Sequence, residues 1–282
     1  MYRLGERWLP GRLGEMKWGI FVTELGHANH CVLEVRGLRK RFGAVQALDG
    51  VTFSVAAGEI VALVGDNGAG KSTTIKMIAG VEQPDEGDIL FEGEPVRLNS
   101  PAIAEKLGIQ TVYQDLALCD NLDIVSNLFL GRELRRTLIP GLVRVLDRNE
   151  MERRAMPVLN ELGIRLPPLD TQVASLSGGQ RQTVAVARSV LWGSKLVMLD
   201  EPTAALGVVQ QRAVLELIQR LAQSGKAVMV ISHNMNDVFK IADRIVVLRL
   251  GRTVAAFERG NVTPEQVVAA ITGASAVEEV TS

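Results

Sequence analysis

The order of hydrophobic and polar positions along the chain predicts an α/β fold. Three short apolar runs, at 60–64, 196–199 and 227–231, contain mostly valine, isoleucine and leucine, a pattern typical of strands buried on both faces. Between these runs, at 74–79 and 210–223, apolar residues recur every three or four positions, as they do in amphipathic helices. Strands that alternate with helices in this way form a mostly parallel sheet.

The region before the first buried run has a different pattern. Residues 32–38 and 47–55 alternate between apolar and polar positions, and 39–43 are expected to form a polar turn between two strands. Residues 88–96 resemble a hairpin that turns at Glu92 and Gly93. We therefore expect a small antiparallel β subdomain beside the main sheet.

The middle of the chain is expected to be mostly helical. Apolar residues have helical spacing at 128–134 and 149–163, and a further helix is expected to begin at Ser177. The pattern predicts an inserted helical subdomain over about 116–187.

The two ends of the chain lack such periodicity. Residues 1–31 mix glycine, charge and single apolar residues, and their apolar run at 18–22 is too short for a signal peptide. We expect a disordered extension over 1–31, one domain over 32–273 and a frayed tail over 274–282.

Composition narrows the classes of function. The formal net charge is −1 and only 4% of residues are aromatic, so neither a basic face nor a base-stacking platform for nucleic acid is expected. The two cysteines fit neither a disulfide framework nor a metal cluster. No apolar run approaches the roughly 20 residues that span a bilayer, so a membrane role would require a partner.

The most informative stretch lies between the first buried strand and the helix that follows it. It has the spacing G-x-x-x-x-G-K-[ST] of a P-loop, in the strand–loop–helix context that supports a triphosphate-binding site. Its residues are Gly65, Asp66, Asn67, Gly68, Ala69, Gly70, Lys71, Ser72 and Thr73. Glycines let backbone N–H groups surround phosphates, and the helix N-terminus favours the same anion. Lys71 is expected to reach the β- and γ-phosphates, and Ser72 to bind Mg²⁺.

Polar residues also follow three other predicted strands. Gln114, the pair Asp200 and Glu201, and His233 each come just after a strand, so a parallel sheet would bring them to one edge. Asp200 is placed to bind Mg²⁺ beside Ser72, and Glu201 to act as general base toward water. Taken alone, the two carboxylates could cap the next helix and His233 could be a satisfied histidine at a strand end. Their position in the set favours the functional interpretation.

A second anion-binding helix start is predicted in the helical region. Ser177, Gly178, Gly179 and Gln180 place a serine and two glycines at a helix N-terminus. One triphosphate does not need two such sites in one chain. The pattern therefore predicts a symmetric dimer, in which each P-loop faces the Ser177 loop of the other subunit.

Together these motifs resemble the ATPase subunit of an ATP-binding cassette (ABC) transporter over roughly residues 32–273. The resemblance implies ATP and Mg²⁺ as ligands, with Phe42 stacked on adenine and His233 at the γ-phosphate. Gln114 would sense Mg²⁺ and couple to a membrane permease, which would dock on the helical subdomain.

The stretches 113–118, 127–133 and 231–235 are similar to bacterial importers of monosaccharides such as ribose, xylose or fructose. The resemblance implies a homodimer, because the chain has one P-loop and one Ser177 motif. It also implies a place on the cytoplasmic face of the inner membrane, and an external sugar-binding protein as an indirect partner. Import rather than export follows only from the resemblance, and the sequence does not name the sugar.

One position departs from the family pattern. Leu206 is followed by Gly207, where the family usually has an aspartate that bridges the dimer. Two other interpretations stay open: a soluble ABC ATPase in DNA repair or translation, and a nucleotide-binding regulator with little turnover. Because Lys71, Glu201 and His233 are all present, hydrolysis is expected.

Overall fold

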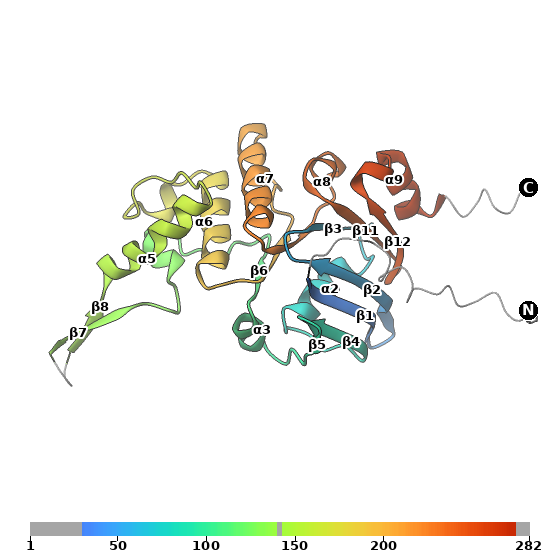
Figure 1. The fold of residues 1–282 in the computed structure, drawn as a ribbon, viewed down its shortest axis with the longest axis horizontal. Helices are drawn as coiled ribbons and strands as arrows, with labels where there is room; N and C mark the ends of the chain where they lie inside the picture. The colour runs from blue at the N-terminus through green and yellow to red at the C-terminus, as the bar shows by residue number, and fades with distance from the viewer. Residues whose placement is uncertain (1–29, 140–142, 275–282) are drawn as a thin grey trace, which may run out of the picture.

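A computed structural model describes residues 30–139 and 143–274 of the chain, which fold into two packed sheets and a helical part (Figure 1). The first sheet is antiparallel, with the strand order β2-β1-β4-β5. Its strands are β1 Cys31–Phe42, β2 Val45–Ala56, β4 Glu86–Phe91 and β5 Glu94–Pro95. The predicted alternating strands and the hairpin at Glu92 and Gly93 are confirmed.

The predicted polar turn over 39–43 is wrong, because β1 continues to Phe42 and pairs there with Val45. The charged residues remain in the strand since acidic residues face them: Arg39 pairs with Asp49 at 3.6 Å, and Lys40 with Asp85 at 3.1 Å.

The second sheet has six strands in the order β12-β11-β3-β10-β9-β6. Five are parallel, and only the edge strand β12 is antiparallel to its neighbour. The strands are β3 Ile60–Val64, β6 Ile109–Val112, β9 Leu196–Asp200, β10 Ala227–Ile231, β11 Arg244–Arg249 and β12 Arg252–Glu258. This arrangement confirms the mostly parallel sheet predicted from the buried apolar runs.

Both faces of this sheet are covered, which explains its continuous apolar strands. Along β3, Val61 and Leu63 face a core shared with α2 and the antiparallel sheet. Ala62 and Val64 face the opposite core, shared with α8 and α9, and α7 covers the neighbouring strands. The helices of this part are α2 Lys71–Ile78, α3 Pro101–Leu107, α7 Val208–Gln223, α8 Met235–Ile241 and α9 Pro264–Thr272.

The helical part has its own core and lies to one side of the sheets (Figure 1). Its helices are α4 Ile124–Leu128, α5 Arg148–Glu161 and α6 Gly178–Leu191. The expectation of a mostly helical segment is wrong over part of its length. The helix predicted at 128–134 ends at Leu128, and a hairpin follows, formed by β7 Arg135–Ile139 and β8 Val143–Leu146. Gly131, at φ 79°, lies in the left-handed region and cannot continue a helix.

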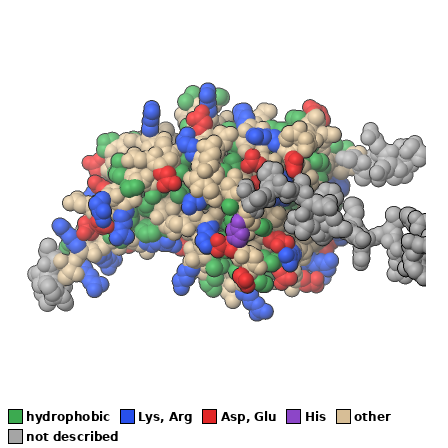
Figure 2. Space-filling view, viewed as in Figure 1, with side chains coloured by type: hydrophobic (Ala, Val, Ile, Leu, Met, Phe, Trp, Pro, Cys, Tyr) green, Lys and Arg blue, Asp and Glu red, His purple; other side chains and the backbone are tan. Residues whose placement is uncertain are grey.

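The predicted N-terminal extension and C-terminal tail lie outside the described residues, apart from 30, 31 and 274. Of the helices that the structure describes, none is long and apolar enough to cross a bilayer. Basic and acidic side chains are interspersed over the face seen in Figure 2.

Candidate functional site

The P-loop connects the end of β3 to the start of α2, as the sequence predicted. Gly65 has φ 154°, and a Cβ at this position would lie 2.2 Å from the carbonyl oxygen of Leu248. Gly70 has φ 102°, and its Cβ would lie 2.4 Å from Leu48 Cδ2. Only glycine fits at these two positions, so the loop keeps a backbone that larger residues would push open.

The Lys71 side chain is hydrogen-bonded back to the P-loop. Its ammonium donates hydrogen bonds to the carbonyl oxygens of Gly65, at 2.7 Å, and Asp66, at 2.9 Å. Burial lowers the pKa of Lys71, while the negative charges of Glu201, Asp66 and Asp200 raise it. Lys71 therefore lies within electrostatic reach of both carboxylates at the end of β9.

The other P-loop residues differ in exposure. Asp66, Asn67 and Gly68 are exposed, and Ala69 is buried. Ser72 is also exposed, so its hydroxyl is available to a ligand, whereas Thr73 is half-buried. The P-loop thus presents backbone groups and the Ser72 hydroxyl to solvent, while its buried residues hold it in place.

Asp200 is the last residue of β9 and is half-buried. Burial raises its pKa above the ordinary value of 3.8, the charge of Glu201 raises it further, and Lys71 opposes both effects. A half-buried carboxylate near an ammonium and an exposed serine hydroxyl supplies the oxygen ligands that Mg²⁺ prefers. The residues predicted to bind the metal therefore have suitable chemistry.

Glu201 and His233 meet between the ends of β9 and β10. Glu201 Oε1 lies 2.8 Å from His233 Nδ1, with the glutamate side chain 15% exposed and the imidazole 76% exposed. The Glu201 backbone has φ 50°, and its N–H donates to the carbonyl oxygen of Ile231 at 2.9 Å. A glutamate in this region of φ is uncommon, so the position holds the side chain in a defined direction.

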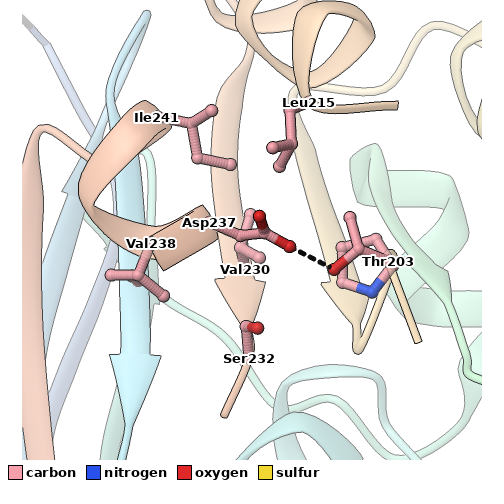
Figure 3. A pocket seen from close by; sticks show the side chains of 9 residues that line it. Thr203, Leu215, Val230, Ser232, Asp237, Val238 and Ile241 are labelled. Atoms are coloured by element: carbon pink, nitrogen blue, oxygen red, sulfur yellow. Dashed lines mark hydrogen bonds between the residues drawn. The ribbon is translucent and has the colours of Figure 1, made fainter. Parts of the chain in front are cut away.

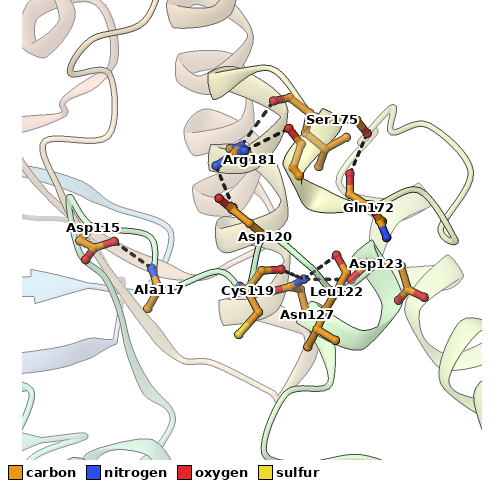
Figure 4. A network of polar contacts seen from close by, with 12 residues as sticks. Asp115, Ala117, Cys119, Asp120, Leu122, Asp123, Asn127, Gln172, Ser175 and Arg181 are labelled. Atoms are coloured by element: carbon orange, nitrogen blue, oxygen red, sulfur yellow. Dashed lines mark hydrogen bonds and ion pairs between the residues drawn. The ribbon is translucent and has the colours of Figure 1, made fainter.

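Gln114 follows β6, the edge strand that pairs with β9, and is exposed. The segment after it is attached to the helical part. Arg188 of α6 donates to the carbonyl oxygens of Leu116 and Ala117, each at 3.0 Å. In Figure 4, Arg181 of the same helix reaches Asp120 at 2.9 Å. A displacement of α6 would therefore also move the segment that follows Gln114.

Phe42 lies at the end of β1 and is 44% exposed, with the Lys40 ammonium 5.4 Å from its ring centroid. Its strand turns into β2, whose Ala47 and Leu48 pack against Gly70 of the P-loop. An exposed aromatic ring is thus carried by the hairpin that supports the loop.

Ser177 is the N-cap of α6 in a capping box. Its Oγ accepts a hydrogen bond from the Gln180 N–H at 3.3 Å, and Gln180 Oε1 accepts one from the Ser177 N–H at 2.9 Å. Gly178 is exposed, and Gly179 is buried against Gln210. Figure 1 shows α6 in the helical part and α2 between the sheets, so one chain does not bring the two anion-binding helix starts together.

Two buried polar residues near Glu201 and His233 were missed by sequence reasoning. Thr203 follows Glu201 by two positions, and Asp237 lies in the helix after His233; both are buried, and they hydrogen-bond to each other. A signal was present in the sequence, because Asp237 shares a helix face with the apolar Ile241 four residues later.

Comparisons with known proteins agree with the geometry of the site. A family model described as ABC transporter matches residues 48–204. The chain is 50% identical to a fructose import ATP-binding protein of Rhizobium meliloti, over 88% of this chain and 96% of that protein. It is 46% identical to a xylose/arabinose import ATP-binding protein of Sulfolobus acidocaldarius, over 86% of this chain and 94% of that protein.

Solved structures of ATP-binding cassettes share the fold. A nucleotide-free cassette from an ABC transporter superposes with a TM-score of 0.72 at 26% identity, covering 85% of this chain and 98% of that one. A dimeric cassette in a post-hydrolysis state, bound to ADP and Pi, has a TM-score of 0.65 at 25% identity, over 80% of this chain and 98% of that one.

Proposed function

Because the chain belongs to the ABC transporter family, we propose that it is the ATP-hydrolysing subunit of a monosaccharide importer. The observation that carries this proposal is the 2.8 Å contact between Glu201 and His233 just after the neighbouring parallel strands β9 and β10, with Lys71 of the P-loop within electrostatic reach of Glu201 and Asp200. In this proposal, phosphate-binding, metal-binding and proton-accepting groups would converge on the γ-phosphate of a bound triphosphate.

The P-loop and Phe42 would hold the nucleotide. Backbone N–H groups of residues 65–73 and the N-terminus of α2 favour the phosphates, toward which the Lys71 ammonium turns when it leaves the loop carbonyls. The exposed Phe42 ring offers a face on which adenine stacks.

Ser72, Gln114 and Asp200 would hold Mg²⁺. Bound Mg²⁺ neutralises charge on the phosphate oxygens. The exposed Ser72 hydroxyl at the start of α2 and the half-buried Asp200 carboxylate at the end of β9 would supply oxygen ligands, and Gln114, after the neighbouring strand β6, would add an amide oxygen.

Glu201 would act as general base in hydrolysis. The attacking water gives a proton to the Glu201 carboxylate, while His233 orients that carboxylate and contacts the γ-phosphate. The Lys71 ammonium stabilises the charge that develops on the transferring group.

The complete site would be formed between two copies of the chain. Residues 177–180 lie far from the P-loop of their own chain, so they would contact the triphosphate held by the partner subunit. The similarity to a dimeric cassette bound to ADP and Pi supports this arrangement.

The membrane permease would dock on the helical part and move with α6, and an external sugar-binding protein would deliver the substrate. The chain would then be peripheral to the cytoplasmic face of the membrane. The names of the fructose and xylose/arabinose relatives support import of a monosaccharide.

Co-purification with a permease tests the proposal. The tagged chain, isolated from gently solubilised membranes of its host, should bring down a multi-spanning permease and hydrolyse ATP at a rate that rises when the sugar-loaded binding protein is added. Purification of an ATP-hydrolysing dimer without any membrane protein would favour a soluble ATPase. Nucleotide binding without turnover would favour a regulator.

A further inference from the structure

Asp237 is a buried carboxylate to which the catalytic scheme gives no role. It lies in α8, and its side chain is only 5% exposed. In Figure 3, the Thr203 hydroxyl donates a hydrogen bond of 2.8 Å to Asp237 Oδ2. The Asn234 side-chain amide donates to the same oxygen at 3.1 Å, and the Lys240 ammonium lies 3.7 Å from the other oxygen, Oδ1.

The two donors to Asp237 lie next to the two residues that meet at the site. Thr203 comes two residues after Glu201, in the loop that follows β9. Asn234 comes directly after His233, in the loop that follows β10. One carboxylate oxygen therefore joins the loop that contains Glu201 to the loop that contains His233.

Apart from the buried Ser232, the other residues around Asp237 are mostly apolar. Leu215, Val230, Val238 and Ile241 line a small void of about 10 Å³ beside it, about the size of one water molecule. A buried carboxylate is unfavourable unless its hydrogen bonds are satisfied, and Thr203 and Asn234 satisfy those of Asp237 Oδ2. Asp237 also lies in the first turn of α8, and its N–H donates to Oδ1 of the N-cap Asn234 at 3.4 Å, so it contributes to the start of this helix as well.

We propose that Asp237 is a positioning residue for ATP hydrolysis. By accepting hydrogen bonds from Thr203 and Asn234, it fixes the positions of Glu201 and His233 relative to each other. This inference rests on the proposed function, because it assumes that Glu201 and His233 act in hydrolysis. Among the hydrogen bonds of the described residues, none joins the P-loop to Asp237, Thr203 or Asn234. Loss of Asp237 should therefore reduce turnover and leave nucleotide affinity unchanged.

Two variants remove the tie in different ways. Asp237→Ala removes both acceptor oxygens, and Thr203→Val removes one donor with little change in volume. We expect each to lower kcat by about 10- to 100-fold, as small displacements of catalytic groups do. The affinity for ATP should be unchanged. Because both variants break the same tie, the double variant should be little slower than either alone.

Two further variants separate positioning from stability. Val238→Ala removes a buried apolar side chain from the same helix and leaves the hydrogen bonds intact, so it should lower the melting temperature and not kcat. Thr203→Ser keeps the hydroxyl and should keep a rate close to that of the parent.

The test is the steady-state ATPase of the assembled transporter, with nucleotide affinity and melting temperature measured for each variant. A loss of kcat in Asp237→Ala and Thr203→Val that exceeds the loss in Val238→Ala supports the proposal. Equal losses in all three, additive losses in the double variant, or weaker ATP binding would overturn it. If the parent transporter does not hydrolyse ATP, the proposed function itself fails and this inference fails with it.

Discussion

Glu201 combines a strained backbone with a side chain held by a neighbour. Its φ of 50° and its 2.8 Å contact with His233 fix the carboxylate at the edge of the sheet. We expect Glu201→Gln to keep ATP affinity and to lower turnover by about 10²- to 10⁴-fold, because an amide cannot accept the proton of the attacking water. ATPase assays and nucleotide-binding measurements on the purified protein check both parts.

Glu92 is a matched control for this variant. It is also a glutamate in the left-handed region, with φ 53°, and it pairs with Lys195 on the surface. Glu92→Gln should leave turnover unchanged. If Glu201→Gln hydrolyses ATP as fast as Glu92→Gln does, Glu201 is not the base.

Asp200 should lower the stability of the nucleotide-free protein at neutral pH. Its pKa is raised by burial, so the folded state holds the proton more tightly than the unfolded state, and stability falls as pH rises from 3.8 through the folded pKa. Asp200→Asn should therefore raise the melting temperature at pH 7, and the gain should shrink as the pH is lowered toward 3.8. Thermal denaturation over a pH series measures this, and ATP with Mg²⁺ should stabilise the variant less than the parent.

Asp85 should behave in the opposite way. The Arg41 N–H and Lys40 hydrogen-bond to it and lower its pKa below 3.8, so its stabilising contribution is present above 3.8 and lost as pH falls through the lower, folded value. Asp85→Asn should lower the melting temperature at pH 7. A gain from both variants, or from neither, would contradict this account of the two carboxylates.

At the scale of elements, the start of α6 is packed closely against α7. A Cβ added to Gly179 would lie 2.7 Å from Gln210 Cβ and 2.8 Å from its Cγ. These atoms are near the backbone of α7 and cannot swing away, so Gly179→Ala should destabilise the protein by about 1–3 kcal/mol through overpacking. Urea unfolding of the purified chain measures the change.

The neighbouring Gly178 is the matched control, because a Cβ there would meet only the flexible end of Leu206, at 3.1 Å. Gly178→Ala should therefore have a smaller effect. Gln210→Gly should recover part of the stability lost in Gly179→Ala, although glycine in a helix itself costs about 1 kcal/mol. Equal effects of the two alanines would show that the contact between α6 and α7 is looser than described.

The elements that the sequence predicted best were those with strong local signals. The buried strands before Gly65 and Asp200, and the helix capped by Ser177, combine apolar periodicity with caps or glycines, and all three are present. The strands at 135–139 and 143–146 were missed because the apolar spacing just before them also fits a helix; Gly131 and the dipeptide Pro140-Gly141 were the sequence signals against one. The length of β1 was missed because its charged end is stabilised by partners distant in sequence, such as Asp85.

For the molecule as a whole, the position of the site could be predicted from strand order. Parallel strands end at one edge, so the sequence alone groups Gln114, Asp200, Glu201 and His233 with the P-loop. The tie between Thr203 and Asp237 could not be predicted in the same way, because it depends on how α8 packs under the loop after β9. Strand ends can be predicted from local sequence patterns, whereas contacts between loops can be identified only in the packed structure.

The separation of the P-loop from Ser177 leads to a prediction about pairs of chains. Lys71→Ala should disable the P-loop side of a shared site. Ser177→Asp should disable the other side, because it keeps an N-cap residue and adds a negative charge that repels phosphate. Each variant alone should form only inactive homodimers. In a mixed dimer, one site combines both altered residues, and the other combines an intact P-loop with an intact Ser177.

Mixing the two inactive variants in equal amounts should therefore restore ATP hydrolysis. With random pairing about half of the dimers are mixed and each has one intact site, so about a quarter of the parent rate is expected if the two sites act independently. The ATPase rate of the mixture, compared with the rate of each variant alone, measures this recovery. If each chain instead formed a complete site by itself, the mixture would be no more active than its components, because no pairing would bring an intact P-loop to an intact Ser177.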